Sequence, residues 1–364
     1  AFVNQHPWSK DVGLVLNFEA RGVTGPSIMF ETSEGNGWLM RQAAQAAPGL
    51  VASSFSYDVY KLLPNDTDLT VFKQAGFAGF NFAFIDGSQH YHAPTDDLAH
   101  LDQRSLQQHG SNALSFTRHF GSLDLTNTRT DDVVYFNLPG SGLIIYSGKL
   151  VIPLTLAVSI LFVACIAIGY RRKRLTIQGM SSGFTAFLIS AGAGIFAVIV
   201  VRVLADMLGG MASVSDKTVL LMSGIAIAAV TAAVYLRFSR KTSAVNLMAG
   251  GIVWWLILAL LTGLFLPGAS YLFVWPLLFI TFGLMLAVLF SPQTLWTTIV
   301  IGILTAPAIL LITPSIYLLF MAMTIESLLF AIVAAVFAAL VVVPFIPLLH
   351  VVATHIAALL PARS

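Results

Sequence analysis

The sequence has little charge, and what charge there is lies mostly at one end. Only 10% of the 364 residues are charged, whereas a soluble domain carries roughly 25%. From Thr242 onward the only acidic residue is Glu326 and the only basic residue is Arg363. A chain this poor in charge over its second half, with a mean hydropathy of +0.83, is not a soluble domain. We expect that half to lie in lipid.

Cysteine is also nearly absent. Cys165 is the single cysteine and lies in an apolar stretch. This excludes a disulfide framework within the chain and a cysteine-rich zinc site. The net charge is only +2, and no basic stretch interleaved with aromatic residues is present. We therefore expect no nucleic-acid partner.

The polar residues are concentrated before residue 140. This part contains 14 of the 17 acidic residues and six of the eight histidines. The chain therefore divides into a water-exposed region, residues 1–145, and a membrane region, residues 146–364. We expect the lipid bilayer to be one of its partners, whereas the oligomeric state is left open.

The second region contains apolar runs long enough to cross a membrane, which takes about 20 residues of helix. Pro267-Gly268, Ser291-Pro292 and Thr313-Pro314 are expected turns between runs. A last stretch, 345–360, is either an eighth span or an interfacial segment, so we expect seven or eight helices. The seven runs are Leu150–Gly169, Phe184–Leu204, Val219–Leu236, Val245–Leu266, Tyr271–Phe290, Leu295–Ile312 and Ile316–Val343.

Basic residues near the span ends predict the orientation. Arg171–Arg174 follow the first span, and Arg237, Arg240 and Lys241 follow the third. If each run crosses once, both clusters lie on one side, which the positive-inside rule makes cytosolic. Residues 1–145 are then expected on the non-cytosolic side, whether periplasmic, luminal or vacuolar.

Five ionisable residues lie within or beside the apolar runs. Arg202 and Asp206 are four residues apart, so they share a helix face and can pair. Glu326, His350 and His355 are the others. Such residues are either functional or make structural interhelical bonds, and the sequence leaves both open.

The water-exposed region alternates between strand-like and helix-like segments. This alternation predicts an α/β domain with a mainly parallel sheet. The long polar helix is expected to break or kink around Gly110. The expected strands are 12–18, 27–30, 77–85 and 133–136, and the expected helices are 37–47 and 97–123.

Two clusters carry residues suited to chemistry. Glu19, in Asn17–Gly22, lies at the C-terminal end of a strand, the edge at which open α/β sheets bind ligands. The second cluster is His90–Asp97, between a Phe-rich strand and the long helix. Imidazole and carboxylate are zinc ligands. On residues alone, Glu19 could equally cap a helix or pair with a cation, and the second cluster could be a solvated turn.

The order and spacing of these motifs resemble a known family. Asn17–Gly22, Leu63–Asp68, Gly79–Phe84 and Tyr91-His92 followed by Asp96 are similar to the second half of zinc metallopeptidases. That family includes secreted leucyl aminopeptidases, glutamate carboxypeptidase, and the endoplasmic-reticulum and vacuolar membrane metallopeptidases. The membrane branch places its peptidase domain outside the cytosol before many spans. His6-Pro7-Trp8 and Ser105–Gly110 also resemble that branch.

The resemblance implies roles for six residues. Two zinc ions are expected, with Glu19 a ligand of one and His92 a ligand of the other. Tyr91 corresponds to a tyrosine that stabilises the oxyanion. Asn65, Asp66 and Asp68 fall in a loop that lines the substrate pocket. His90, His100, His109 and His119 are not assigned to metal.

The sequence also departs from the family. Upstream, the family requires a ligand His, a bridging Asp and an adjacent Glu-Glu pair that supplies the general base. No Glu-Glu pair occurs in this sequence. We therefore expect the N-terminal part of the peptidase domain to be missing, and the chain alone to be inactive.

These features predict a membrane-anchored, zinc-dependent exopeptidase, most consistent with an aminopeptidase, that cleaves peptides outside the cytosol. Two alternatives remain open. One is a non-catalytic receptor or scaffold with a degenerate peptidase domain, and the other is a glutaminyl-cyclase-like acyltransferase. Substrate preference and amino- versus carboxypeptidase action are not readable from the sequence.

Overall fold

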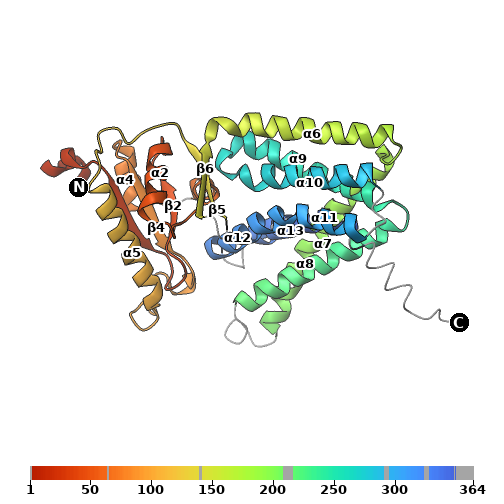
Figure 1. Ribbon diagram of the computed structural model, residues 1–364. Coiled ribbons are helices and arrows are strands. Elements are labelled where there is room, and N and C mark those ends of the chain that lie inside the picture. The colour runs from red at the N-terminus through yellow and green to blue at the C-terminus, as the bar shows by residue number, and fades with distance from the viewer. Residues whose placement is uncertain are drawn as a thin grey trace. The chain divides into compact units, whose positions relative to one another are not determined.

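A computed structural model divides the chain into two compact units (Figure 1). The first comprises residues 1–153 together with 262–271, and the second comprises residues 154–261 and 272–364. The described residues are 2–63, 65–138, 142–207, 216–290, 295–323, 328–347 and 349.

The first unit is a four-stranded sheet with helices on both faces and a separate two-stranded hairpin (Figure 1). Its strands are β1 Val15–Ala20, β2 Ile28–Thr32, β3 Val51–Ala52, β4 Gly79–Phe84, β5 Val133–Leu138 and β6 Gly142–Ser147. Its helices are α1 Phe2–Gln5, α2 Gly37–Ala46, α3 Ser54–Lys61, α4 Asp68–Gln74 and α5 Gln103–Phe120, with short 3-10 turns η1 Pro7–Asp11, η2 Ser88–His90 and η3 Gly148–Leu150.

The strand order in the sheet is β1-β4-β2-β3. β1 pairs with β4 in parallel, β2 pairs with β3 in parallel, and β2 and β4 are antiparallel. Two of three pairings are thus parallel, and the predicted α/β class is confirmed. Because β1 and β4 are parallel neighbours, the segments that follow them leave from the same edge of the sheet.

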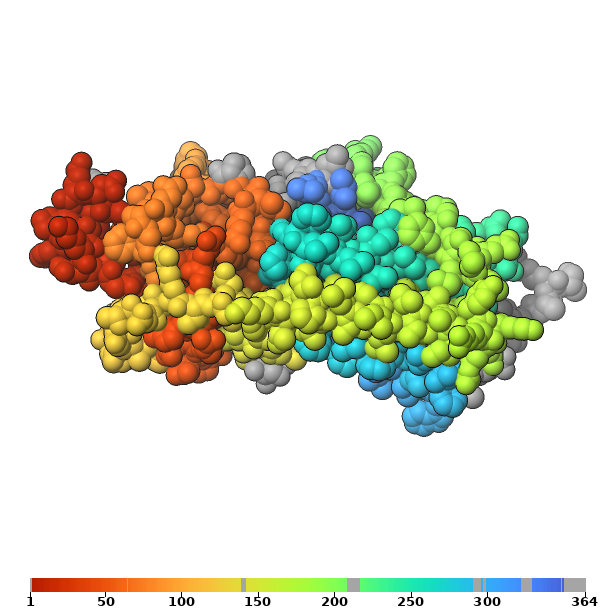
Figure 2. Space-filling model, turned by 90° about the horizontal axis from the view of Figure 1, so that it is seen from above, coloured from red at the N-terminus to blue at the C-terminus, as the bar shows by residue number. Residues whose placement is uncertain are grey.

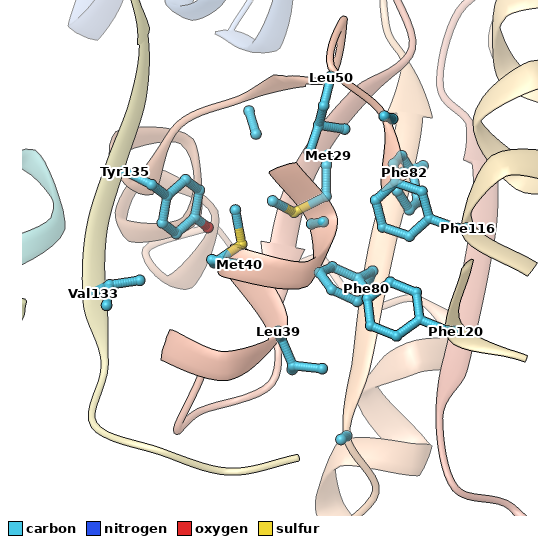
Figure 3. Packing of buried hydrophobic residues seen from close by; sticks show 14 residues of the cluster. Met29, Leu39, Met40, Leu50, Phe80, Phe82, Phe116, Phe120, Val133 and Tyr135 are labelled. Carbon is cyan, nitrogen blue, oxygen red and sulfur yellow. The ribbon is translucent and has the colours of Figure 1, made fainter. Parts of the chain in front are cut away.

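One face of β4 belongs to an aromatic core (Figure 3). Phe80 and Phe82 are fully buried and meet Phe116 of α5 edge to face, with ring centroids 5.1 and 5.0 Å apart. Phe120, one helical turn further along α5, contacts Phe80 at 5.4 Å. α5 therefore covers this face of the sheet, and burial of large aromatic rings provides much of the driving force for folding.

The opposite face of β4 carries Gly79, Asn81 and Ala83, because successive side chains of a strand alternate between faces. Leu69 of α4 packs against Gly79, where a Cβ would lie only 2.6 Å from the Leu69 Cδ1 atom. α4 thus covers this second face, which is where the polar side chains of the sheet lie.

Residues 262–271 belong to the first unit although they lie far along the chain. The Ala269 N–H donates to a carboxylate oxygen of Asp58 at 3.0 Å, and the Ser54 hydroxyl donates to the Gly268 carbonyl at 2.6 Å. The rings of Tyr271 and Phe136 stack with centroids 4.3 Å apart. This short segment is therefore held by α3 and β5.

The second unit consists of apolar helices (Figure 1). They are α6 Val151–Arg171, α7 Ile177–Met207, α8 Asp216–Ser239, α9 Ala244–Phe265, α10 Tyr271–Leu289, α11 Leu295–Leu304, α12 Ala306–Met323 and α13 Leu328–Val342, with the 3-10 turn η5 Val343–Phe345; the 3-10 turn η4 Pro267–Ala269 belongs to the first unit. Within the described residues, six helical segments are long and apolar enough to span a membrane, and Leu329–Phe345 is a shorter apolar one.

These helices expose large apolar side chains. α6 runs along the viewed surface in yellow-green in Figure 2, and its Ile160 and Val163 are 69% and 61% exposed. Exposure of that kind over a whole helix is stable in hydrocarbon and not in water. The chain is a multi-pass membrane protein, as predicted.

Two expectations about helix ends were wrong. Pro314 lies inside α12, not in a turn between spans, because an apolar helix packed among neighbours tolerates the one backbone hydrogen bond that proline removes. α11 and α12 are interrupted only at Thr305, whose hydroxyl donates to the Gly302 carbonyl at 2.6 Å, and Ile299–Met321 forms one apolar segment long enough to span a membrane. α5 is continuous through Gly110 and begins only after Asp102, which caps it by accepting from the Arg104 and Ser105 N–H groups.

The predicted pairing of Arg202 and Asp206 is confirmed, since the Arg202 Nε atom lies 3.2 Å from an Asp206 oxygen. Glu326, His350 and His355 lie outside the described residues, as does most of the stretch 345–360. The choice between seven and eight spans therefore stays a prediction.

Candidate functional site

Glu19 is the fifth of the six residues of β1 and is half-buried. It alternates with Phe18, which stacks on Phe82 with a ring separation of 4.6 Å. Phe18 thereby faces the aromatic core, and Glu19 faces the side covered by α4. Its Oε1 atom accepts a hydrogen bond from the Asn17 side-chain amide at 3.0 Å.

Asn81 of β4 connects Glu19 to the interior. It lies opposite Asn17 in the parallel register, and its Oδ1 atom accepts from the Asn17 Nδ2 atom at 2.9 Å. Its own Nδ2 atom donates to Glu31 at 2.8 Å and to the Thr67 hydroxyl at 2.7 Å. Asn81 is fully buried, and these bonds engage its oxygen and both its amide hydrogens.

Glu31 of β2 is a carboxylate with only 3% of its surface exposed. Its second oxygen lies 2.6 Å from the Lys73 ammonium, and this pairing offsets the cost of burying the charge. The Lys73 ammonium also lies 3.5 Å from the Tyr57 hydroxyl. Burial, reinforced by the negative charge of Glu31, raises the pKa of Tyr57, so this hydroxyl stays protonated.

Asn65, Asp66 and Asp68, the predicted substrate-binding residues, are exposed. They surround Thr67, the N-cap residue of α4, whose N–H donates to the Thr70 hydroxyl at 3.2 Å. The bond from Asn81 to Thr67 attaches this loop to the same face of the sheet as Glu19. The structure thus joins Glu19 and the 65–68 loop through one network.

Tyr91 and His92 lie on the loop that follows β4 and are exposed. Their rings stack at 3.8 Å. His92 has φ of +57°, a conformation uncommon outside glycine and concentrated at functional sites. Glu19 precedes the end of β1 and His92 follows the end of β4, so both belong to the same edge of the sheet. The hydrogen-bond network that includes Glu19 does not include His92.

His90 and His100 in the loop, and His119 in α5, have local partners. The His90 Nδ1 atom lies 2.9 Å from the Thr95 hydroxyl, and the His100 Nδ1 atom lies 2.7 Å from Asp97. His119 bonds to Gln42 at 2.8 Å. These hydrogen bonds account for the orientation of the three imidazole rings without a metal ion.

Across the described ranges, no three His, Cys, Asp or Glu side chains are grouped closely enough to hold a metal ion. Glu19 and His92 nonetheless fit zinc by ligand type. Asn17 gives Glu19 the hydrogen-bonded support that ligating carboxylates usually have. The two residues fit as part of a ligand set, to which further ligands must be added.

A sequence model of peptidase family M28 matches residues 1–117. This region of the chain is similar to that family. Curated relatives are also similar to the chain. Human endoplasmic reticulum metallopeptidase 1 is 30% identical over 156 residues, and the vacuolar membrane protease of Eremothecium gossypii is 25% identical over 151. A putative endoplasmic reticulum metallopeptidase 1 of Schizosaccharomyces pombe is 28% identical over 208 residues.

The chain spans only a small part of these relatives. The alignments cover 41%, 40% and 54% of this chain and 17%, 14% and 23% of the human, Eremothecium and Schizosaccharomyces proteins, respectively. No solved structure matches the chain. The activity of the whole protein is therefore a matter for proposal.

Reasoning from the sequence missed Asn81, Glu31 and Lys73 as parts of the site. One pattern could have identified Asn81, which stands between Phe80 and Phe82 in a buried strand. A polar residue at that position must face away from the aromatic core and needs a partner. Nothing in the sequence indicated that Glu31 and Lys73, 42 positions apart, would be that partner and its counter-ion.

Proposed function

We propose that this chain is part of a membrane-anchored, zinc-dependent exopeptidase, an aminopeptidase that cleaves peptides on the non-cytosolic side. The observation that carries the proposal is the placement of Glu19. It lies near the C-terminal end of a parallel strand in an M28 region, with its carboxylate held by Asn17 at 3.0 Å. Open α/β sheets bind their ligands at this edge.

In this proposal Glu19 and His92 each bind one of two zinc ions. A zinc pair supplies an activated water and polarises the scissile carbonyl. The remaining ligands and the general base come from residues of the complete protein that are not in this chain. The chain by itself is accordingly proposed to be inactive.

Exposed residues of the first unit are proposed to take the supporting roles. Tyr91 is 44% exposed, so its hydroxyl is free to approach a substrate and donate to the developing oxyanion. Asn65, Asp66 and Asp68 present polar side chains on a loop anchored by Thr67 and are proposed to line the substrate pocket. The apolar helices hold this machinery at the membrane surface.

The test uses the complete membrane protein, purified with its lipids or in detergent. Glu19→Gln and His92→Ala should each lower the release of amino acids from aminoacyl reporter substrates by at least about 100-fold, since loss of a ligand exceeds the 10–100-fold effect of losing a residue behind one. Each should also lower the zinc content measured by elemental analysis. His119→Gln, whose side chain on α5 bonds to Gln42 of α2, is the matched control and should leave both unchanged.

Two results would contradict the proposal. Full activity in Glu19→Gln or His92→Ala would remove that residue from the metal site. A wild-type protein that binds no zinc and hydrolyses no reporter would favour the receptor or scaffold alternative.

A further inference from the structure

We infer that Glu31, acting through Asn81 and Asn17, is a positioning residue that sets the orientation of Glu19 and of the 65–68 loop together. This inference rests on the proposed function, because it gives Glu19 a metal to hold. It assigns roles to the buried ion pair of Glu31 and Lys73 and to the amide pair of Asn81 and Asn17, which lie behind the proposed site.

Glu31 presents a carboxylate to the side-chain amide of Asn81. A carboxylate accepts hydrogen bonds and donates none, so the group that faces it at 2.8 Å must be the NH₂ of Asn81. The amide of Asn81 is thereby turned with its oxygen toward β1. That oxygen in turn requires the NH₂ of Asn17, which lies 2.9 Å away.

The same constraint reaches Glu19. Once the Asn17 amide is turned with its NH₂ toward Asn81, its second hydrogen is directed to the Glu19 Oε1 atom at 3.0 Å. Reversing either amide would place an oxygen against an acceptor, which is repulsive in a buried setting. The negative charge of Glu31 thus ensures that Glu19 meets a donor.

A second branch leaves Asn81 for the substrate loop. The other hydrogen of its NH₂ goes to Thr67 at 2.7 Å, between Asp66 and Asp68. One buried amide therefore fixes both the strand that carries the metal ligand and the loop proposed to contact substrate. Residues of this kind behind a ligand typically change metal affinity or activity 10–100-fold when mutated.

Lys73 is the counter-ion of Glu31. Its ammonium lies 2.6 Å from Glu31, which stabilises the ionised carboxylate within a site that is almost fully buried. Replacing Glu31 alone leaves Lys73 without its counter-ion and can unfold the domain. Replacing both residues with uncharged ones removes that problem and isolates the effect of the acceptor.

The experiment compares Glu31→Met/Lys73→Met, Asn81→Ala and Asn17→Ala in the complete protein. Zinc affinity is measured by competition with a fluorescent chelator, together with the melting temperature and separate kcat and KM values for a reporter peptide. All three variants should bind zinc about 10–100-fold more weakly. Asn81→Ala and the double variant should in addition raise KM, because both changes also release Thr67, whereas Asn17→Ala leaves the bond from Asn81 to Thr67 in place.

Ser27→Ala is the matched control. Ser27 is fully buried and bonds to His109 at 2.7 Å and to Asn112 at 3.1 Å, on the other side of the sheet and outside the network. It should lower the melting temperature and leave zinc affinity unchanged. A purely structural role for Glu31 would make the double variant behave in the same way, which would overturn the inference.

Glu19→Gln, run alongside, separates the two levels. If it lowers zinc affinity and the network variants do not, the positioning role is wrong and the proposed metal site stands. If Glu19→Gln itself leaves zinc affinity unchanged, the metal site is wrong and the positioning role is lost with it.

Discussion

His109 shows how a single residue in this protein can make folding depend on pH. It lies on α5 with the rings of Phe18 and Phe84 packed edge-on against its imidazole, at 4.9 and 5.2 Å. Its Nδ1 atom contacts the buried Ser27 hydroxyl. Burial in this apolar setting lowers the pKa of His109 below its ordinary value, because desolvation disfavours the charged form.

The direction of the effect follows from proton linkage. The unfolded chain takes up the proton near the ordinary histidine pKa of about 6.5, and the folded protein does so only at lower pH. Stability from this residue is therefore complete above about pH 6.5 and is lost as the pH falls toward the folded-state pKa. His109→Gln should flatten the decrease in melting temperature between pH 7.5 and 5.5, followed by tryptophan fluorescence.

Asn112→Ala is the control for that measurement. It removes the other hydrogen bond to Ser27 without removing a titratable group, so it should lower the melting temperature by a similar amount at both pH values. A pH dependence in His109→Gln equal to that of the wild type would contradict this account.

At the scale of elements, the sequence predicted helices and strands best where a segment has one clear local pattern of apolar residues. The richness in Phe of residues 77–85 located β4, and helical spacing located α2 to within one residue. The strand β6, Gly142–Ser147, was missed because it lies between the last predicted strand, 133–136, and the first predicted span, which begins at Leu150. Its pairing with β5 is a tertiary fact that no local pattern contains.

The positions of some candidate site residues were also predictable from the sequence. Motif order identified Glu19 and His92, which occupy loop and strand-end positions next to parallel strands. The network behind Glu19 depends on β2 lying antiparallel beside β4. That arrangement brings Glu31 to Asn81, 50 positions away, and sequence spacing does not determine strand order.

Gly268 provides a test at this scale. A Cβ at this position would lie 2.7 Å from the Ser54 carbonyl oxygen and 2.8 Å from an Asp58 carboxylate oxygen. Burial also raises the pKa of Asp58, so the site already holds a carboxylate that is costly to ionise. Gly268→Ala should destabilise the first unit by about 1–3 kcal/mol, the usual effect of overpacking.

The measurement is thermal unfolding of the complete protein combined with hydrogen exchange of α3, whose amides should exchange faster in the variant. Gly49→Ala is the matched control, because a Cβ there meets no atom within 4 Å. Equal stability of the two variants would show that the segment 262–271 is not held by α3.

At the scale of the whole molecule, the segment 262–271 bears on membrane topology. It belongs to the first unit, so it must lie on the same side of the membrane as residues 1–147. Four spans, α6 to α9, separate the two stretches, and an even number of crossings returns the chain to its starting side. The basic clusters after α6 and α8 give the same topology independently, because they lie on the opposite side of the membrane from residues 1–147.

Single cysteines test that topology, because Cys165 is the only native one and is buried. In a Cys165→Ala background, Ser122→Cys, Pro267→Cys, Arg172→Cys and Arg240→Cys place thiols at exposed positions. In sealed vesicles with the cytosolic face outward, a membrane-impermeant maleimide should label the two arginine positions. Ser122→Cys and Pro267→Cys should react only after permeabilisation. Opposite labelling of these two would break the link between the segment and the first unit, and labelling of both from outside would reverse the proposed orientation of the peptidase region.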